Sequence, residues 1–213
     1  MPTSAEVKFC LNCGLPLERQ AADTRTRQER IASTAPAPLA EKMRAARATS
    51  ERKPVTAVFA DVVNSTTLAE SMDPEDWTEI INEAFERMSR GIYRYEGTIA
   101  RLMGDAILAF FGAPVAHEDD PERAVRAGLD MVARVADFGR ELKRTHGIDF
   151  QIRVGMNTGP VVVGNVGTDL AYEYTATGDA VNVAARMQSA ARPGTVLITA
   201  ATYRFVGAAS SLK

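Results

Sequence analysis

The chain has 213 residues, 46% of them hydrophobic and 24% charged, which fits one ordinary globular domain plus an extension. The formal net charge of −2 excludes a bulk attraction to nucleic acid or to anionic lipid, so we expect neither as a partner. The charge is divided unevenly, because residues 1–53 carry 10 Lys and Arg against 6 Asp and Glu, whereas residues 54–213 carry 15 against 21.

Neither a membrane span nor an export signal is evident in the sequence. No stretch of 18 uninterrupted apolar residues occurs, so we expect no transmembrane helix and no membrane partner. The start of the chain, MPTSAEVKFC, lacks the apolar core of a signal peptide. We therefore expect a cytoplasmic protein, in which two cysteines would not normally form a disulfide.

Cys10 and Cys13 lie in FCLNCGLPL, a C-x-x-C knuckle that is half of a zinc ribbon. Tetrahedral zinc needs four ligands, yet the chain has no other cysteine, and its histidines, His117 and His146, lie in a different segment. We therefore predict that residues 1–17 form a half zinc-ribbon-like knuckle that holds no zinc within one chain. Either the knuckle has lost its other half, or it pairs with another chain.

Residues 18–53 are predicted to be a flexible, disordered linker. The stretch ASTAPAPLA is rich in Pro and Ala, and its flanks are charged without a sustained apolar stripe. The following AEKMRAARATSERK could form a transient helix, or a longer helix that signals between domains, and the residues leave both possibilities open.

From residue 54 onward the apolar pattern becomes regular. VTAVFAD predicts a buried strand, and Asp73-Pro74 starts a helix whose apolar residues recur at helical spacing. GTIARLMGDAILAFFG predicts a β-hairpin around MGD. Asp120-Pro121 opens a second long helix, and FQIRVGMNTGPVVVGNVG indicates a strand pair punctuated by Gly.

Two further segments complete the predicted domain. YEYTATGDAVNVAARMQ indicates a strand followed by a helix, and GTVLITAATYRFV indicates a strand and a last helix. The order β-α-β-β-α-β, followed by more elements, predicts an α+β fold over residues 54–213, a ferredoxin-like βαββαβ sandwich.

Two carboxylates are the first candidates for chemistry. Asp61 ends the first strand, and Asp105 follows Gly104 at the hairpin tip; in a ferredoxin-like sheet these two places meet. Close carboxylates repel unless a cation lies between them, and hard oxygen ligands favour Mg²⁺ or Mn²⁺, as two ions for phosphoryl chemistry. The alternative is a pair of solvated turn acids. Backbone amides after the strand would face an anion: those of Val62, Val63, Asn64, Ser65 and Thr66.

Asn182 and Arg186 are the second pair of candidates. They are four residues apart, so they share one face of the predicted helix. An amide suits a sugar hydroxyl or ring oxygen, and a guanidinium suits a phosphate that gains charge in a transition state. On spacing alone, a polar outer face with Arg186 in a surface ion pair is the favoured alternative.

Four motifs in order, FADVVNSTTLAE, RLMGDAILAFFG, RVGMNTGPVVVGNVG and YTATGDAVNVAARMQ, resemble the class III adenylate and guanylate cyclase catalytic domain. The resemblance covers the chain from about Pro54 to its end. The FCLNCGLPL start resembles the zinc-ribbon lead-in of bacterial cyclases with a long ATPase region downstream.

The resemblance implies roles for particular residues. Asp61 and Asp105 would hold two divalent cations for attack of the ribose 3′-hydroxyl of ATP on the α-phosphorus, with pyrophosphate as the leaving group. Asn182 would orient the ribose, and Arg186 would stabilise the transition state. Thr175 would read the purine, as in the bacterial Thr-containing adenylate cyclase subgroup, which makes cyclic AMP.

In this family the metal and nucleotide residues lie on opposite faces, so the resemblance implies a head-to-tail homodimer with two shared sites. Three departures from the family pattern stand out. Arg101 replaces the Lys that usually reads adenine, and Asn64 and Ser65 replace the common Gly and Phe. The family normally continues into two more strands with a triphosphate-binding Lys, so we expect a C-terminally truncated domain. For function, the leading hypothesis is an adenylate cyclase. The alternative is a catalytically weak nucleotide-binding module that regulates or dimerises a larger signalling protein.

Overall fold

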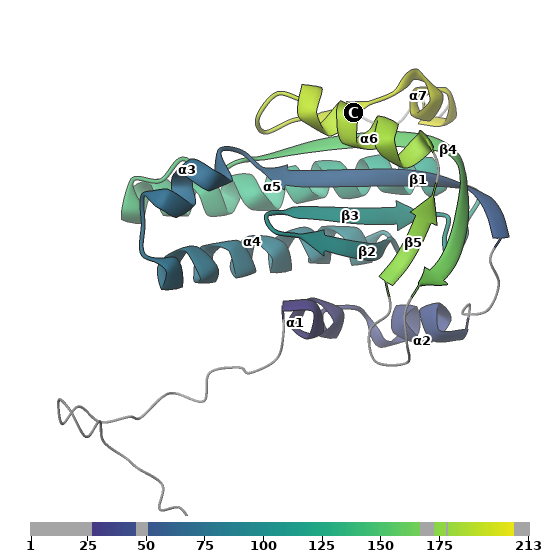
Figure 1. The fold of residues 1–213 in the computed structure, drawn as a ribbon, viewed down its shortest axis with the longest axis horizontal. Helices are drawn as coiled ribbons and strands as arrows, with labels where there is room; N and C mark the ends of the chain where they lie inside the picture. The colour runs from purple at the N-terminus through teal and green to yellow at the C-terminus, as the bar shows by residue number, and fades with distance from the viewer. Residues whose placement is uncertain (1–26, 46–50, 167–172, 178, 207–213) are drawn as a thin grey trace, which may run out of the picture.

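The computed structural model describes residues 27–45, 51–166, 173–177 and 179–206 (Figure 1). The knuckle predicted around Cys10 and Cys13 lies outside the described residues. In chain order the elements are α1 (Arg27–Ser33), α2 (Ala37–Ala45), β1 (Glu51–Val62), α3 (Ser65–Glu70), α4 (Pro74–Arg94), β2 (Thr98–Met103), β3 (Ala106–Phe111), α5 (Asp120–His146), β4 (Ile152–Val166), β5 (Glu173–Thr177), α6 (Asp179–Ala190), β6 (Val196–Ile198) and α7 (Ala200–Val206).

The strands form one six-stranded sheet with the order β2-β3-β1-β4-β5, and β6 pairs with β4. Every pairing is antiparallel except the one between β4 and β6. The segment β1-α4-β2-β3-α5-β4 has the predicted βαββαβ order, so the predicted α+β, ferredoxin-like fold is confirmed. Within it, β1 lies between β3 and β4, which puts its end beside the hairpin of β2 and β3.

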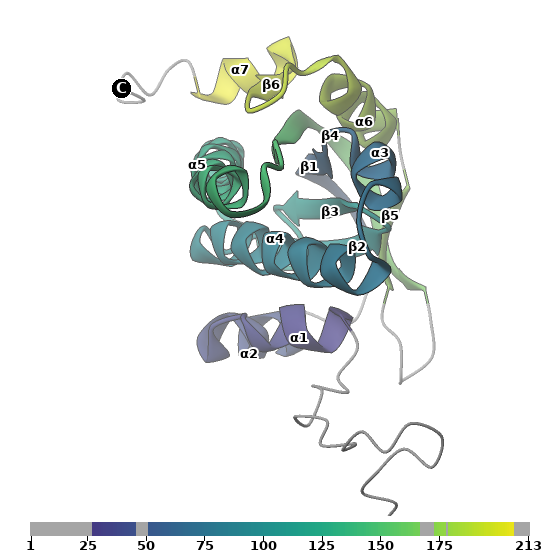
Figure 2. The same ribbon diagram turned by 90° about the vertical axis from the view of Figure 1, so that its left-hand side faces the viewer.

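Helices cover the two faces of the sheet unequally (Figure 2). The long helices α4 and α5 pack on one face, where the larger core cluster contains Phe85, Met131 and Met156. Strand residues whose side chains point to the other face, such as Ala57 and Phe110, form a smaller cluster there with Ala180 and Ala184 of α6. The period of two along β1 therefore divides its side chains between two cores.

The structure differs from the prediction of a strand pair in FQIRVGMNTGPVVVGNVG. This segment is one long strand, β4, in which Gly155 and Gly159 are sites of close packing rather than turns. A Cβ atom on Gly155 would lie 1.9 Å from the backbone nitrogen of Gln188 in α6. Glycine at this position therefore lets α6 pack directly onto the strand.

Within the disordered linker predicted for residues 18–53, the structure corrects the prediction over residues 27–45 and 51–53. Residues 27–45 form α1 and α2, which pack against α4, and β1 begins at Glu51 rather than after residue 53 (Figure 1). Ile31 and Leu39 are each only 3% exposed and belong to the larger core cluster. Two isolated apolar residues do not make a stripe in the sequence, so the pattern gave no sign of this packing. No helix in the described part of the chain is long and apolar enough to cross a membrane.

Candidate active site

Asp61 and Asp105 come together at one edge of the molecule, as their places in the predicted elements indicated. Asp61 is the next-to-last residue of β1 and is paired in register with Ala106, the first residue of β3. The Val62 amide donates a hydrogen bond to the Asp105 carbonyl over 3.3 Å. Between β2 and β3 the chain turns in two residues, and Gly104 has a φ of 59°, a conformation that favours glycine.

The surroundings of Asp61 disfavour its ionised form. Burial raises the pKa of the Asp61 carboxyl, and the neighbouring Asp105 raises it further by charge repulsion and by a hydrogen bond. Arg153 and Gln188 act in the opposite direction. The Gln188 amide donates to Oδ2 of Asp61 over 3.0 Å, and Nη2 of Arg153 lies 3.4 Å from the same oxygen.

Ser65 makes a contact that is not evident in the sequence. Its hydroxyl donates a hydrogen bond to Oδ2 of the Asp105 carboxylate. This serine stands where Phe is common in the family that the sequence resembles, so the aromatic contact is replaced by a donor to a candidate metal ligand. Ser65, Thr66, Gly104 and Asp105 line part of a cavity of about 460 Å³.

The two carboxylates fit a divalent cation that takes its other ligands from a substrate. The described residues contain no group of three or more His, Cys, Asp or Glu side chains that could enclose an ion. Mg²⁺ typically binds through one or two carboxylates together with waters and substrate phosphates, so a pair is sufficient. Burial and the neighbouring Asp105 raise the pKa of Asp61, the direction expected for two close carboxylates without a cation between them.

The backbone after β1 agrees only in part with the predicted phosphate loop. The Val62 and Val63 amides are already bonded within the chain, to the carbonyls of Asp105 and Gln151 respectively. The prediction that these two amides face a phosphate is therefore corrected. Asn64 has a φ of 55°, a left-handed conformation that asparagine tolerates, and it directly precedes α3.

Asn182 and Arg186 lie on the exposed side of α6, away from the carboxylates of their own chain. Both side chains are exposed, and Nη2 of Arg186 lies 3.9 Å from Oδ1 of Asp179. Gln188, which contacts Asp61, is instead 8% exposed. Because each helical residue turns by about 100°, Gln188 points roughly 120–160° away from Asn182 and Arg186. A single chain thus presents the two predicted half-sites in different directions.

The candidate purine-reading residues come from two other strands. Arg101 lies in β2 next to a register shift, and its partner across the pairing is Leu108. Thr175 lies in β5, paired in register with Gly164 of β4. Their assignment to the purine stays a prediction.

Two residues near the carboxylates were missed in the sequence. Arg153 stands directly across from Asp61 in the register of β1 and β4, and its Nε is buried without a hydrogen-bond partner among the described residues. Gln188 lies two residues after Arg186. Strand register and helix rotation bring both to Asp61, and neither is visible in a linear motif.

Comparisons with known proteins show the family of the chain. The profile of the adenylate and guanylate cyclase catalytic domain matches residues 48–211. Adenylate cyclase 1 of Rhizobium meliloti is 36% identical over 137 residues, which are 64% of this chain and 21% of that protein. The chain thus spans about a fifth of the length of this curated relative.

In comparisons with solved structures, the match covers most of both chains. The adenylyl cyclase CyaB from P. aeruginosa is 34% identical, with a TM-score of 0.67 over 76% of this chain and 84% of that chain. The guanylyl cyclase Cya2 is 32% identical, with a TM-score of 0.71 over 75% and 81% of the two chains. One protein named as an adenylyl cyclase and one named as a guanylyl cyclase therefore both share this fold.

Proposed function

The chain belongs to the adenylate and guanylate cyclase catalytic domain family, and from that premise we propose that it is an adenylate cyclase. It would convert ATP to 3′,5′-cyclic AMP and pyrophosphate for intracellular signalling. The observation that carries this proposal is the meeting of Asp61 and Asp105, which arrive from separate elements at one point. The cytoplasmic location stays a prediction from the sequence alone.

Asp61 and Asp105 are the residues that would hold Mg²⁺ or Mn²⁺, two ions per site. Bound there, the cations would favour loss of the ribose 3′-hydroxyl proton and neutralise charge on the triphosphate. Ser65 would orient the Asp105 carboxylate through its hydrogen bond, as outer residues commonly do around metal ligands. Gln188 would support Asp61 in the same way.

Asn182 and Arg186 would act on the nucleotide itself. The Asn182 amide would orient the ribose so that its 3′-oxygen lies in line with the α-phosphorus. As the 3′-oxygen bonds to phosphorus, the bond from phosphorus to the bridging oxygen breaks, and pyrophosphate carries away that electron pair. The Arg186 guanidinium would stabilise the charge that grows on the phosphoryl oxygens.

The site would be completed by a second copy of the chain. In one chain Asn182 and Arg186 are exposed on the side of α6 that faces away from Asp61, so they are available to a partner. A head-to-tail homodimer would bring the carboxylates of each chain to the Asn182 and Arg186 of the other. Two equivalent sites would follow from the two-fold symmetry.

The choice of ATP rests on Thr175, which stands where the cyclic AMP-producing subgroup carries threonine. The test is to incubate the purified chain with Mn²⁺ and either ATP or GTP and to measure both cyclic nucleotides. We expect cyclic AMP to dominate, and to vanish with Asp61→Ala. Cyclic GMP as the main product would contradict the substrate assignment. Retention of activity in the Asp61→Ala variant would contradict the metal assignment.

A catalytically weak nucleotide-binding module is the second candidate. The observation that favours it is the contact of the cationic Arg153 side chain with Asp61, which competes with a metal ion for the same oxygen. Arg101, in place of the usual Lys, points the same way. Binding of ATP with Mn²⁺ but no cyclic product in the assay above would select this candidate.

A further inference from the structure

The helices α1 and α2 precede the region that matches the family, yet they are bound to the catalytic fold. They lie along α4 on the side away from the sheet (Figure 2). The contacted α4 residues, Asn82, Glu86 and Ser89, recur at spacings of three and four and so form one face of that helix. Nη2 of Arg30 lies 2.6 Å from Oε1 of Glu86, and the Thr34 hydroxyl is 3.1 Å from that of Ser89.

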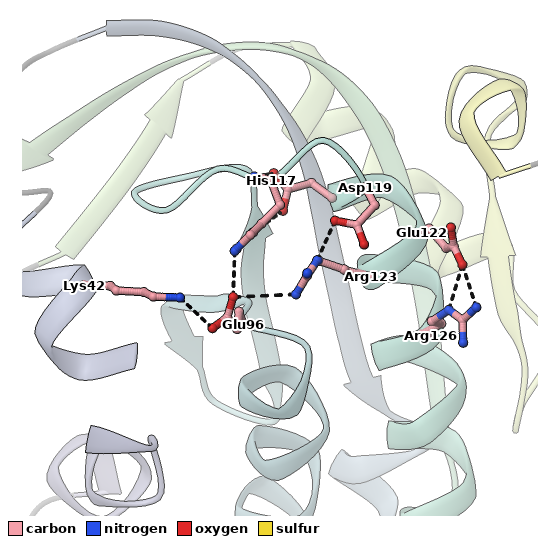
Figure 3. A network of polar contacts seen from close by, with 8 residues as sticks. Lys42, Glu96, His117, Asp119, Glu122, Arg123 and Arg126 are labelled. Atoms are coloured by element: carbon pink, nitrogen blue, oxygen red, sulfur yellow. Dashed lines mark hydrogen bonds and ion pairs between the residues drawn. The ribbon is translucent and has the colours of Figure 1, made fainter. Parts of the chain in front are cut away.

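A second group of contacts fixes α2, as Figure 3 shows. Nζ of Lys42 donates to Oε1 of Glu96 over 2.9 Å. The other Glu96 oxygen lies 2.6 Å from Nε2 of His117 and 3.6 Å from Nη1 of Arg123. The hydrogen bond from Lys42 is the main cause that lowers the pKa of the Glu96 carboxyl. Glu96 thus joins α2 to the end of α4 and the start of α5.

At the other end of this segment, Arg27 reaches the turn that carries Asp105. Its Nη1 donates to the Gly104 carbonyl over 2.9 Å, and its Nε donates to Oδ1 of Asn82 over 2.8 Å. The guanidinium carbon lies 5.0 Å from the centre of the Phe85 ring, a cation–π distance. Arg27 also lines the same cavity as Ser65 and Asp105.

Apart from the Ser65 hydrogen bond to the Asp105 carboxylate, few contacts within the described residues hold the Gly104–Asp105 turn. Gly104 is exposed, and a Cβ atom placed on it would have no atom within 4 Å. From outside the hairpin, the backbone of this turn receives the 2.9 Å bond from Arg27 and the longer 3.3 Å bond from Val62. The Arg27 bond has a charged donor, which makes it the stronger type of the two.

We propose that Arg27 is a positioning residue that holds the Gly104–Asp105 turn in place, so that docking of α1 and α2 controls the carboxylate at Asp105. The consequence for catalysis rests on the proposed cyclase function, but the positioning itself does not. When Arg27 is bound to Asn82 and Gly104, the turn is tied to α4 at two points. When α1 leaves α4, the turn loses both ties to that helix, keeps only its contacts with Val62 and Ser65, and becomes more mobile.

The test compares Arg27→Met with Arg30→Met in the full chain. Methionine at position 27 keeps an apolar stem against Phe85 but removes every donor. Each variant loses one link between α1 and α4, and Arg27→Met also loses the bond to the Gly104 carbonyl. Amide hydrogen exchange over residues 101–108 is measured first. We expect Arg27→Met to speed exchange at the turn about tenfold, and Arg30→Met to leave it unchanged.

The second readout is the dissociation constant of Mn²⁺, measured by electron paramagnetic resonance with 3′-deoxy-ATP, which lacks the reacting hydroxyl. We expect about a tenfold weaker constant for Arg27→Met, which Arg27→Lys restores in part because lysine keeps a donor. The proposal would be overturned if Arg27→Met left both the exchange rate and the Mn²⁺ affinity unchanged. It would also be overturned if Arg30→Met altered them as much as Arg27→Met does. Faster exchange at the turn in a chain that makes no cyclic AMP would refute the cyclase function and leave the positioning role intact.

Discussion

Mixing two inactive variants should restore activity if the site is shared between chains. Asp105→Ala removes a carboxylate from one half-site, and Arg186→Ala removes the phosphate-binding residue from the other. Gln188 and Arg186 point in different directions from α6, and Gln188 contacts Asp61 of its own chain. One chain therefore cannot direct both faces of α6 to a single nucleotide without a large rearrangement.

The expected recovery follows from the two-fold symmetry of such a dimer. Random pairing of equal amounts of the two chains gives about half mixed dimers, and each mixed dimer has one intact site and one doubly damaged site. The mixture should therefore reach about a quarter of the wild-type rate per chain. As the mixing ratio is varied, the rate should be highest at equal amounts and fall symmetrically on both sides.

The assay is cyclic AMP formation at several mixing ratios, with mixed dimers verified by two different affinity tags. A matched control mixes Asp61→Ala with Asp105→Ala, because every site in that mixture lacks a carboxylate and none can recover. Activity that stays at the level of the separate variants, despite verified mixed dimers, would refute the shared site. Equal recovery in the control mixture would refute the assignment of both carboxylates to one half-site.

Three further predictions concern the two carboxylates and the packing of α6 on β4. Burial and Asp105 raise the pKa of Asp61, so its ionised form lowers the stability of the metal-free fold at neutral pH. Asp61→Asn should therefore lower turnover at least about a hundredfold but raise the free energy of unfolding without metal. This gain should disappear in acid, where Asp61 is protonated, and thermal unfolding across pH measures it. Ser65→Ala removes the donor to Asp105 and should weaken Mn²⁺ binding about tenfold by resonance titration, with an unchanged constant arguing against any role in orienting the ligand. Gly155→Ala puts a Cβ atom 1.9 Å from the Gln188 nitrogen and should cost about 3 kcal/mol in chemical unfolding, whereas Gly159→Ala, which meets a methyl at 3.0 Å, should cost clearly less.

The sequence was sufficient to predict the sheet and the carboxylate pair. The buried strand VTAVFAD, the MGD hairpin and the βαββαβ order placed the first strand beside the hairpin, and the two acids stand at the ends of those elements. The separation of Asn182 and Arg186 from Asp61 also agrees with the expectation of opposite faces. The meeting of the two acids follows from the order of the predicted elements, whereas the opposite faces were implied by the family resemblance.

Other features could not be predicted because they depend on packing between distant residues. The docking of α1 rests on Arg27, Ile31 and a few polar pairs, whose partners on α4 lie more than fifty residues away. Likewise, glycines in RVGMNTG were interpreted as turn residues, although Gly155 lies inside a strand because a helix backbone occupies the space of its side chain. In each case the deciding partner is an element whose position is unknown at the level of sequence.

The helix α6 connects these observations, because its two sides serve two different half-sites. Its inner side bonds Asp61 through Gln188, and its outer side carries Asn182 and Arg186. Contact with Gly155 fixes the height of α6 above β4, and Ala180 and Ala184 fix its rotation in the smaller core. A shift of α6 must therefore move the support of the carboxylates in one site and the ribose and phosphate groups offered to the other. In the proposed dimer, this shared helix is a direct physical link between the two active sites.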